Sequence, residues 1–349
     1  MADDDPNPRL WVANLDAEEA WRAGPARTLP QRVLERLAVF GALLAPRARP
    51  GDALWLPHPV DRRRLPHLHP DVALLSGPPR EVLRRHPHHA PCPWADAAPW
   101  VDDARAAAAA RVNDRRSALE LGRRLDVADP RAALLEGPEA LRRWLESWPG
   151  LERWVLKARF SASGRDRHVH YGDSPAVADR AIERLFARHG ELVFEPWHER
   201  YEDVGVLFHT DRPGELKIHR QRIGPGGAAS AIELNVGDDI PGIETVLGVA
   251  RRVAEALQDA GYTGPAGVDA WRHRRDGALH WHHLGEINAR WSVGWLARRA
   301  ADAIGLTRTG VALRGGDEST LTQASRRRDV HPLVLPAPGS HGLWLEVER

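Results

Sequence analysis

The chain has 349 residues, enough for two or three compact units that each bury a core. Hydrophobic residues make up 42% and charged residues 28%, which is the balance of an ordinary globular protein. The 49 Lys and Arg against 48 Asp and Glu leave a formal net charge of +1, so no strong field favours nucleic acid or an anionic membrane as a partner.

The single cysteine, Cys92, excludes an internal disulfide framework and a cysteine-based zinc site within one chain. No stretch approaches the roughly 20 consecutive apolar residues of a membrane span, and the first eight residues are acidic and polar. We therefore expect a cytoplasmic protein without a membrane anchor.

Short apolar runs and one helical stretch fill the first hundred residues. The runs Leu10 to Val12 and Ala53 to Leu56 are typical of strands, and Gln31 to Leu44 between them is typical of a helix. This order predicts a small α/β unit. Two stretches rich in proline and histidine, Leu56 to Pro70 and His86 to Pro99, are expected to be loops because proline breaks the backbone hydrogen-bond ladder.

Helices and strands alternate through the following residues. A single helix is expected from Asp102 to Leu125, which has no proline and no glycine before Gly122. The other expected helices are Pro138 to Ser147, Ala176 to Arg188 and Gly242 to Gly261. The expected strands are Arg153 to Lys157, Leu192 to Glu195, Val204 to Thr210, Glu215 to His219, Gly267 to His273 and Leu279 to Asn288. Short turns join the last four strands in pairs, which predicts two hairpins.

Three side chains that carry oxygen lie on the last two expected strands. Glu286 and Asn288 are two residues apart, so they point to the same face, and a paired strand can place Asp269 beside them. Carboxylate and amide oxygens suit a hard cation such as Mg²⁺, which usually keeps substrate phosphates and waters among its ligands. The same residues also fit a polar strand edge that faces water, and the spacing alone does not decide between the two.

A lysine at a strand end and a later hinge segment are suited to binding a nucleotide. Lys157 is followed by the small-residue loop Ser161 to Arg165, which can present an ammonium group and backbone N–H groups to phosphates. No P-loop motif is present. The strand Leu192 to Trp197 runs into a proline and can offer backbone groups to an adenine, although a buried strand leaving the core would look the same. Acceptors that could hold ribose, or simply lie on a solvated loop, are Glu199, Glu202 and Asp203.

In their order along the chain these pieces resemble the ATP-grasp superfamily, from roughly Asn113 to Gly294, about half of the chain. Val112 to Arg115 is similar to the Asn-Asp-Lys segment that opens the nucleotide-binding region in many members, with Arg115 in place of the lysine. The strand that ends at Lys157 and its loop resemble the family strand and mobile glycine-rich loop. The other matching pieces are Glu195 to Trp197, similar to the adenine hinge, and Asp269 with Glu286 to Arg290, similar to the metal-binding pattern.

This resemblance implies that ATP and Mg²⁺ bind together. Lys157 would contact the α-phosphate, and Ser163 and Gly164 would close over the β- and γ-phosphates. Glu195 and Trp197 would flank the adenine. The ribose would be held by Asp203 or, less favourably, by Glu202.

The resemblance also implies the metal and catalytic residues. Asp269, Glu286 and Asn288 would coordinate one or two Mg²⁺ ions. Arg290 would stabilise the transferring phosphoryl group or bind the substrate carboxylate. The residues that compete for a second phosphate contact are Lys217, Arg220 and Arg222.

The implied fold is α/β (α+β), an ATP-grasp fold preceded by an N-terminal α/β domain of the pre-ATP-grasp kind. The expected parts are an N-terminal domain (1–105), an ATP-grasp N-terminal subdomain with the phosphate-binding loop (106–195), a C-terminal subdomain with the metal site (196–310) and a C-terminal extension (311–349). Two features depart from the family: the loop has one glycine, Gly164, and the N-terminal unit has no glycine fingerprint. The sequence therefore does not identify the substrate.

Two histidine-rich segments offer other metal sites. His280 and His282 share a face of an expected strand and could bind zinc with a third ligand. The loop that holds His86, His88 and His89 also carries Cys92, which could form a metal clip. Solvated or core histidines and a polar linker are the plainer interpretations of these segments.

The expected function is that of an ATP-dependent carboxylate-amine ligase, in which an acyl-phosphate is attacked by an amine. The expected partners are a small-molecule carboxylate and an amine or peptide. The oligomeric state is left open, a homodimer included. Two alternatives remain: an ATP-grasp kinase that stops at phosphoryl transfer to a small molecule, and a nucleotide-binding protein without turnover.

Overall fold

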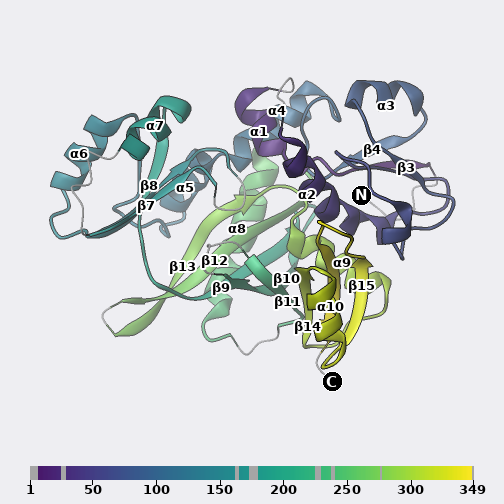
Figure 1. The fold of residues 1–349 in the computed structure, drawn as a ribbon. Coiled ribbons are helices and arrows are strands. Elements are labelled where there is room, and N and C mark those ends of the chain that lie inside the picture. Colours follow the sequence, from purple (N-terminus) through teal and green to yellow (C-terminus); the bar gives the residue numbers. More distant parts are fainter. Residues whose placement is uncertain are drawn as a thin grey trace.

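The computed structural model of the chain describes residues 7–24, 29–161, 165–172, 180–224, 229–236, 240–275 and 277–347. Two four-stranded sheets and one eight-stranded sheet organise these residues. Figure 1 shows the N-terminal sheet on the right, the second four-stranded sheet on the left, and the large sheet between and below them. No helix in the described part of the chain is both long and apolar enough to cross a lipid bilayer.

The N-terminal sheet is parallel throughout, so the carboxyl ends of its strands share one edge. Its strand order is β3 (Ala73–Leu75), β2 (Ala53–Trp55), β1 (Arg9–Val12) and β4 (Ala90–Pro93). The α-helices of this unit are α1 (Ala17–Ala23), α2 (Gln31–Gly41) and α3 (Pro79–Arg85), and its 3₁₀-helices are η1 (Ala42–Arg47) and η2 (Arg62–Arg64). The expected α/β unit is confirmed.

The prediction of a loop from His86 to Pro99 is wrong in part. Within His86 to Pro99 the chain forms β4, which contains two prolines and pairs with β1. Because β4 is the last strand of the sheet, its outer side has no strand to bond, and prolines are tolerated on such an edge.

The single helix expected from Asp102 to Leu125 is two helices. These are α4 (Asp103–Asn113) and α5 (Arg115–Arg124), separated by Asp114. Asp114 is extended, and its carboxylate accepts from the backbone N–H of Arg116. The aspartate therefore caps a new helix where composition alone would continue the old one.

The second four-stranded sheet is antiparallel. Its order is β5 (Ala133–Leu135), β8 (Leu192–Pro196), β6 (Arg153–Ala158) and β7 (Arg167–Tyr171), with α6 (Pro138–Glu146) and α7 (Arg180–His189). Trp154, Leu156 and Phe194 pack in one buried cluster with α6 and α7 residues. Side chains alternate along a strand, so Lys157 and Glu195 point to the face away from these helices.

The large sheet begins after this unit and extends to the end of the described chain. In chain order its strands are β9 (Arg200–His209), β10 (Arg212–Ile223), β11 (Ala229–Leu234), β12 (Pro265–Arg275), β13 (Ala278–Asn288), β14 (Val311–Gly316), β15 (Asp329–Val334) and β16 (Gly342–Val347). Across the sheet they run β13-β12-β9-β10-β11-β14-β16-β15. The strands after residue 310 thus extend the same sheet, and the expected domain boundaries stay a prediction.

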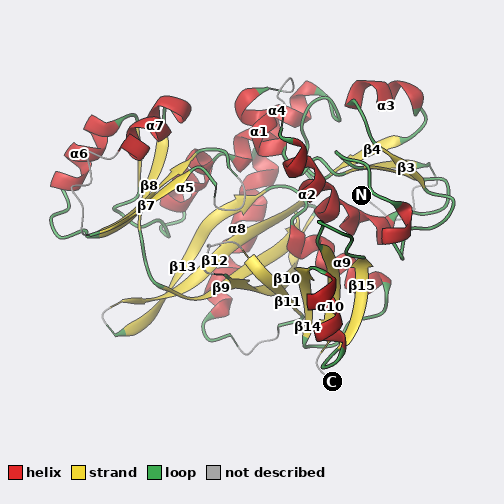
Figure 2. Ribbon diagram, in the orientation of Figure 1, coloured by secondary structure: helices red, strands yellow, loops and turns green. Residues whose placement is uncertain are grey.

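The two faces of the large sheet differ near β9 and β12. Val206 and Val268 pack against the apolar stripe of α8 (Ile243–Asp259), and we call this side the helix face. Gly205 and Asp269 lie one residue along and therefore point to the other side, which we call the site face. Figure 2 shows α8 as a long helix running beside these strands. The remaining helices are α9 (Val293–Ala303) and α10 (Glu318–Ser325).

A histidine fills the space between β9 and the start of α9. His219 of β10 is 3% exposed. A Cβ added to Gly205 would lie 2.1 Å from its ring, and one added to Gly294 would lie 2.6 Å away. Glycine at both positions is therefore what allows α9 to approach the sheet.

The Gly205→Ala substitution should lower the free energy of unfolding by about 1–3 kcal/mol, because the His219 ring must shift in a packed interior. Gly248→Ala is the matched control in the middle of α8, where an added Cβ meets nothing within 4 Å. That change should raise stability by about 0.5–1 kcal/mol. Urea unfolding measures both, and equal midpoints for the two variants would contradict the packing described here.

Candidate functional site

The hairpin of β12 and β13 brings the three predicted oxygen donors together. Asp269 pairs directly with Glu286, and Asn288 lies opposite Gly267. Nδ2 of Asn288 donates to Oδ2 of Asp269 at 3.0 Å, and Nε2 of Gln221 donates to Oδ1 at 2.9 Å. The three residues thus converge on the site face, and their role as metal ligands remains a prediction.

The electrostatics of this cluster fit a hard cation. Burial raises the pKa of Asp269 to about 6, and the negative charge of Glu286 adds to the rise. A cation beside both carboxylates would offset their charges, and oxygen donors suit Mg²⁺. Within the described ranges no three His, Cys, Asp or Glu side chains form a metal-binding group, so the set depends on the Asn288 amide and on ligands from a substrate.

Arg115, at the start of α5, connects Glu286 to Ser161, the first residue of the predicted phosphate-binding loop. Its Nη2 lies 2.8 Å from Oε1 of Glu286 and also donates to the backbone carbonyl of Ser161 at 2.9 Å. Its Nη1 donates to Oγ of Ser161 and to the carbonyl of Ala158. The arginine is buried, so its charge is directed at the loop and the carboxylate together.

The phosphate-contact residues predicted in the loop, Ser163 and Gly164, lie outside the described residues. Both ends of the loop are described. Arg115 holds Ser161 at one end, and at the other end the positive charge of Arg165 helps to lower the pKa of Glu19 on α1. The loop therefore begins beside α5 and ends within electrostatic reach of α1.

Lys157 and Glu195 form an ion pair on the wall opposite the large sheet. Nζ of Lys157 lies 2.5 Å from Oε2 of Glu195, and the side chains are 13% and 14% exposed. Burial lowers the pKa of Lys157 against the opposing charge of Glu195. Burial, the largest single effect, raises the pKa of Glu195, but the charge and hydrogen bond of Lys157 together with the charges of His282 and Arg115 make the net shift downward.

A stack of three side chains closes the space between this ion pair and Asp269. The Trp271 ring has the Arg200 guanidinium 3.9 Å from its centroid, and the centroid of the His282 ring lies 4.0 Å away. Nζ of Lys157 is 5.7 Å from the same ring. A Cβ on Gly285 would lie 1.8 Å from Trp271, so only glycine leaves room for the indole.

The space left beside this stack is small. A cavity of about 20 Å³ lies among α5, β8 and β13, with Glu195 and His282 in its lining. Pockets for cofactor-sized ligands enclose about 300–1,000 Å³. This cavity is therefore too small to hold a nucleotide with its lining side chains where they lie.

Trp197 and Asp203 lie beside the same stack. The Trp197 ring has the guanidinium groups of Arg167 and Arg200 each 5.7 Å from its centroid. Nη1 of Arg200 lies 2.6 Å from Oδ1 of Asp203. Arg200 thus contacts the predicted adenine and ribose residues, although the sequence analysis did not select it.

Four of the predicted residues do not lie beside Asp269. Glu202 pairs with Arg220 and Arg272, and alternation along β9 and β10 puts this network on the helix face. Lys217 is exposed near the β9–β10 turn, four residues along the strand from Gln221, which is about 13 Å. Arg222 pairs with Glu233. The structure therefore gives no support for Glu202, Arg220 or Lys217 beside Asp269.

Arg290 forms an ion pair with a residue of the N-terminal unit. Its Nη2 lies 2.7 Å from Oε1 of Glu18 on α1, with side chains 13% and 9% exposed. The charge of Arg290 also helps to lower the pKa of Asp269, against the larger effect of burial. Arg290 therefore lies between the oxygen-donor cluster and α1.

Some residues around Asp269 were not predicted from the sequence, although strand periodicity could have indicated two of them. Trp271 follows Asp269 by two residues, and Gln221 follows the buried His219 by two, so strand periodicity places each on the site face. Glu18 had no such signal, because its contact with Arg290 joins residues 272 positions apart.

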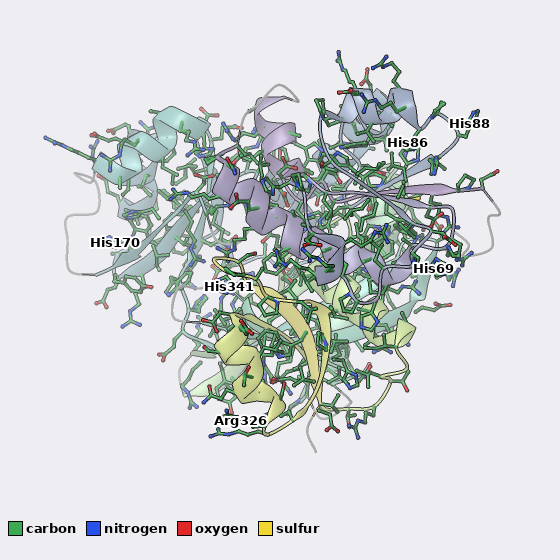
Figure 3. The ribbon with its side chains drawn as sticks, turned by 45° about the vertical axis from the view of Figure 1, so that its right-hand side comes forward. His69, His86, His88, His170, Arg326 and His341 are labelled. Atoms are coloured by element: carbon green, nitrogen blue, oxygen red, sulfur yellow. The ribbon has the colours of Figure 1, made fainter. Side chains whose placement is uncertain are left out.

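The histidine-rich segments do not gather into a metal site in the described part of the chain. On β13 the His282 ring stacks on Trp271, and His280 faces His273 with ring centroids 6.1 Å apart. His86 and His89 contact edge to face at 5.3 Å. Figure 3 shows His86 and His88 at the outer surface of the N-terminal unit.

Comparison with known proteins finds likeness in structure only. No family model matches the chain, and no curated protein sequence matches it. The solved structure of N5-carboxyaminoimidazole synthetase from Staphylococcus aureus with ADP superposes with a TM-score of 0.62 and 9% identity, covering 89% of this chain and 91% of that one. The chain has an ATP-grasp fold.

Two further ATP-grasp structures agree with this assignment. N5-carboxyaminoimidazole ribonucleotide synthetase from Thermus thermophilus gives a TM-score of 0.58 at 15% identity, covering 97% of this chain and 93% of that one. A biotin carboxylase–ATP complex from Campylobacter jejuni gives 0.58 at 13%, covering 98% and 87%. The predicted fold, with its N-terminal α/β domain, is confirmed, and at these identities the likeness concerns the fold alone.

His219 and Asp269 are both close to the Gln221 amide. Nε2 of Gln221 lies 3.5 Å from Nε2 of His219 and donates to Oδ1 of Asp269. Burial lowers the pKa of His219 to about 4, so the ring is neutral in the folded protein. A histidine in the unfolded chain takes up a proton near pH 6.5.

Because the folded pKa is the lower one, the contribution of His219 to stability is complete above pH 6.5 and is lost as the pH falls toward 4. The loss should amount to about 3 kcal/mol for a shift of this size. In His219→Gln the decline in unfolding free energy between pH 7 and pH 4 should be smaller by that amount. His88→Gln, at an exposed ring, is the control and should decline as the wild type does. Identical pH profiles for wild type and His219→Gln would refute this assignment.

Proposed function

We propose that this chain is an ATP-dependent ligase that activates a carboxylate as an acyl-phosphate for attack by an amine. The observation that carries the proposal is the convergence of Asp269, Glu286 and Asn288 on a face opposite the Lys157–Glu195 pair. The ATP-grasp fold supports it, because the solved structures that share it include synthetases and a carboxylase with ADP or ATP.

In this proposal the nucleotide lies between the second four-stranded sheet and the site face. Lys157 and Arg115 bring positive charge to the phosphates, and Ser163 and Gly164 close over them. Trp197 and Glu195 flank the adenine. Asp203 holds the ribose once Arg200 has released it, whereas Glu202 stays engaged on the helix face.

Asp269, Glu286 and Asn288 would hold Mg²⁺, which when bound supplies charge neutralisation at the β- and γ-phosphates. A carboxylate oxygen of the substrate forms a bond to the γ-phosphorus while the bond to the β-phosphate oxygen breaks, and ADP leaves. The amine nitrogen then bonds to the acyl carbon, inorganic phosphate leaves and the nitrogen loses a proton. The chain contributes orientation, positive charge and exclusion of water.

Trapping with hydroxylamine tests this reaction class. The purified protein is incubated with Mg-ATP and a panel of carboxylic acids, and hydroxamate and ADP are measured together. A ligase should form hydroxamate with its acid. Release of ADP with a hydroxyl substrate and no hydroxamate from any acid would instead identify a kinase, and nucleotide binding without ADP release would indicate a protein without turnover.

Glu286→Gln and Asn288→Ala should each lower Mg²⁺-dependent ADP release at least 100-fold, because each removes an oxygen donor or its charge. Lys217→Ala is the control at an exposed position away from the cluster and should keep the wild-type rate. Thermal unfolding of all three variants checks the fold. Normal turnover in either cluster variant would remove that residue from the metal site.

Lys157→Ala should weaken the binding of ATP, and it should also lower the melting temperature. Removing the ammonium group takes away the phosphate contact and also leaves Glu195 unpaired. Lys157→Ala with Glu195→Gln removes that second penalty, so the double variant should recover stability without recovering affinity for ATP. Calorimetric titration with a non-hydrolysable ATP analogue measures the affinity, and unchanged affinity in the single variant would exclude Lys157 from the site.

A further inference from the structure

All four Nη–H groups of Arg115 are used inside the chain. Nη1 donates to the carbonyl of Ala158 at 2.7 Å and to Oγ of Ser161 at 2.9 Å. Nη2 donates to the carbonyl of Ser161 at 2.9 Å and to Oε1 of Glu286 at 2.8 Å. Among these acceptors Glu286 alone is charged, so the positive charge of the arginine is balanced by a residue of the predicted metal cluster.

The start of α5 holds this guanidinium in place. The carboxylate of Asp114 accepts from the backbone N–H of Arg116 and bonds to Nε of Arg159 at 3.0 Å. Arg159 and Arg116 each pair with Glu191 at 2.6 Å. The backbone N–H of Arg115 itself donates to the carbonyl of Arg159 at 3.2 Å. Both the backbone and the side chain of Arg115 are therefore fixed, and the residue is 9% exposed.

Oxygens of the predicted metal cluster are bonded to groups of the chain. Oδ1 of Asp269 accepts from the Gln221 amide, and Oδ2 accepts from the Asn288 amide. Those two donors are neutral, whereas the donor to Glu286 is the guanidinium of Arg115. Both oxygens of Glu286 belong to one carboxylate, so a cation on either oxygen would meet the charge of Arg115 at short range and be repelled.

Arg115 also faces the wall where the phosphates are proposed to lie. Burial is the main cause of the lowered pKa of Lys157, and the charges of Arg200 and Arg115 add to it. The cavity of about 20 Å³ among α5, β8 and β13 has room for one water and is lined by Arg115 and Glu195. Figure 1 shows α5 beside the second four-stranded sheet. A phosphate bound at this wall would therefore offer the guanidinium a second anion.

We propose that Arg115 closes the metal site to free Mg²⁺ and opens it only when nucleotide phosphates draw the guanidinium away from Glu286. The inference rests on the proposed function and adds the order of binding, in which the metal enters with the nucleotide or after it. The exchange leaves Glu286 paired with the metal and Arg115 paired with a phosphate. Neither buried charge is left alone, which would be strongly unfavourable.

Binding of Mn²⁺ without nucleotide tests the closed state, because electron paramagnetic resonance measures the free ion directly. Mn²⁺ accepts the same carboxylate and carbonyl oxygens as Mg²⁺. Arg115→Gln frees Glu286 and should bind Mn²⁺ about ten-fold more tightly than the wild type, since the fraction of molecules with an open site sets the apparent affinity. Arg116→Gln changes the next arginine of α5, which pairs with Glu191 instead, and should bind Mn²⁺ as the wild type does.

Binding of a non-hydrolysable ATP analogue in EDTA should change in the opposite direction. Arg115→Gln lacks the charge that moves to the phosphates, so its affinity for the analogue should fall about ten-fold. A substitution that only distorted the site would weaken both ligands. Arg115→Lys is the second variant, in case Arg115→Gln does not fold. Its ammonium group lacks the planar fork that holds the loop and Glu286 together, so it should also bind Mn²⁺ more tightly than the wild type, by a smaller factor.

The overturning results separate the inference from the proposed function. If Mn²⁺ alone binds the wild type as tightly as it binds each folded Arg115 variant, Arg115 does not close the site, and the proposed function stands. The same holds if Arg115→Gln loses affinity for Mn²⁺ and for the analogue together. If Mn²⁺ binds to no variant and does not strengthen binding of the analogue to the wild type, the metal cluster of the proposed function is wrong and the inference fails with it.

Discussion

The pairing of β12 with β13 places two carboxylates directly opposite each other, at Asp269 and Glu286, and much of the site compensates for that repulsion. Like charges at directly opposed positions of a sheet are destabilising. Arg115 neutralises Glu286, and the amides of Gln221 and Asn288 donate to Asp269. Because Arg115 also bonds to Ser161, the same arginine holds one end of the predicted phosphate-binding loop.

On the opposite wall the charges are also paired within the chain. Lys157 is held by Glu195, and Arg200 is held by Asp203 while it covers Trp271. In the proposed function Lys157 would face a phosphate, and Asp203 would leave Arg200 to hold the ribose. Binding would therefore exchange internal pairs for pairs with the ligand, and affinity would depend on the difference between the two sets of contacts.

Strand periodicity explains how much of the site the sequence could predict. The spacing of Glu286 and Asn288, together with a hairpin partner at Asp269, was enough to bring those three residues together. The same rule argues against Arg220, which is adjacent to Gln221 and must point to the helix face. Glu202 fails for the same reason, since its neighbour Asp203 occupies the site face.

Other features could not be predicted because they depend on contacts distant in sequence or on a local cap. Asp114 ends one helix and starts another within a run whose composition favours a single helix. The prolines of β4 are acceptable only because that strand lies at the edge of its sheet, which the order of strands decides. The order of the strands lies outside any window of sequence, whereas the cap at Asp114 lies inside one but is outweighed there by the helix-favouring residues on both sides.

The ion pair of Glu18 with Arg290 crosses the limit of the family resemblance. That resemblance covers residues from about Asn113, whereas Glu18 belongs to the N-terminal unit, which carries no fingerprint. The fold is shared at 9–15% identity with enzymes that act on different molecules, so the fold does not specify the substrate. What the chain does specify is the partner of Arg290. Both side chains are largely buried, so separating them would leave an uncompensated charge inside the protein, which is strongly unfavourable.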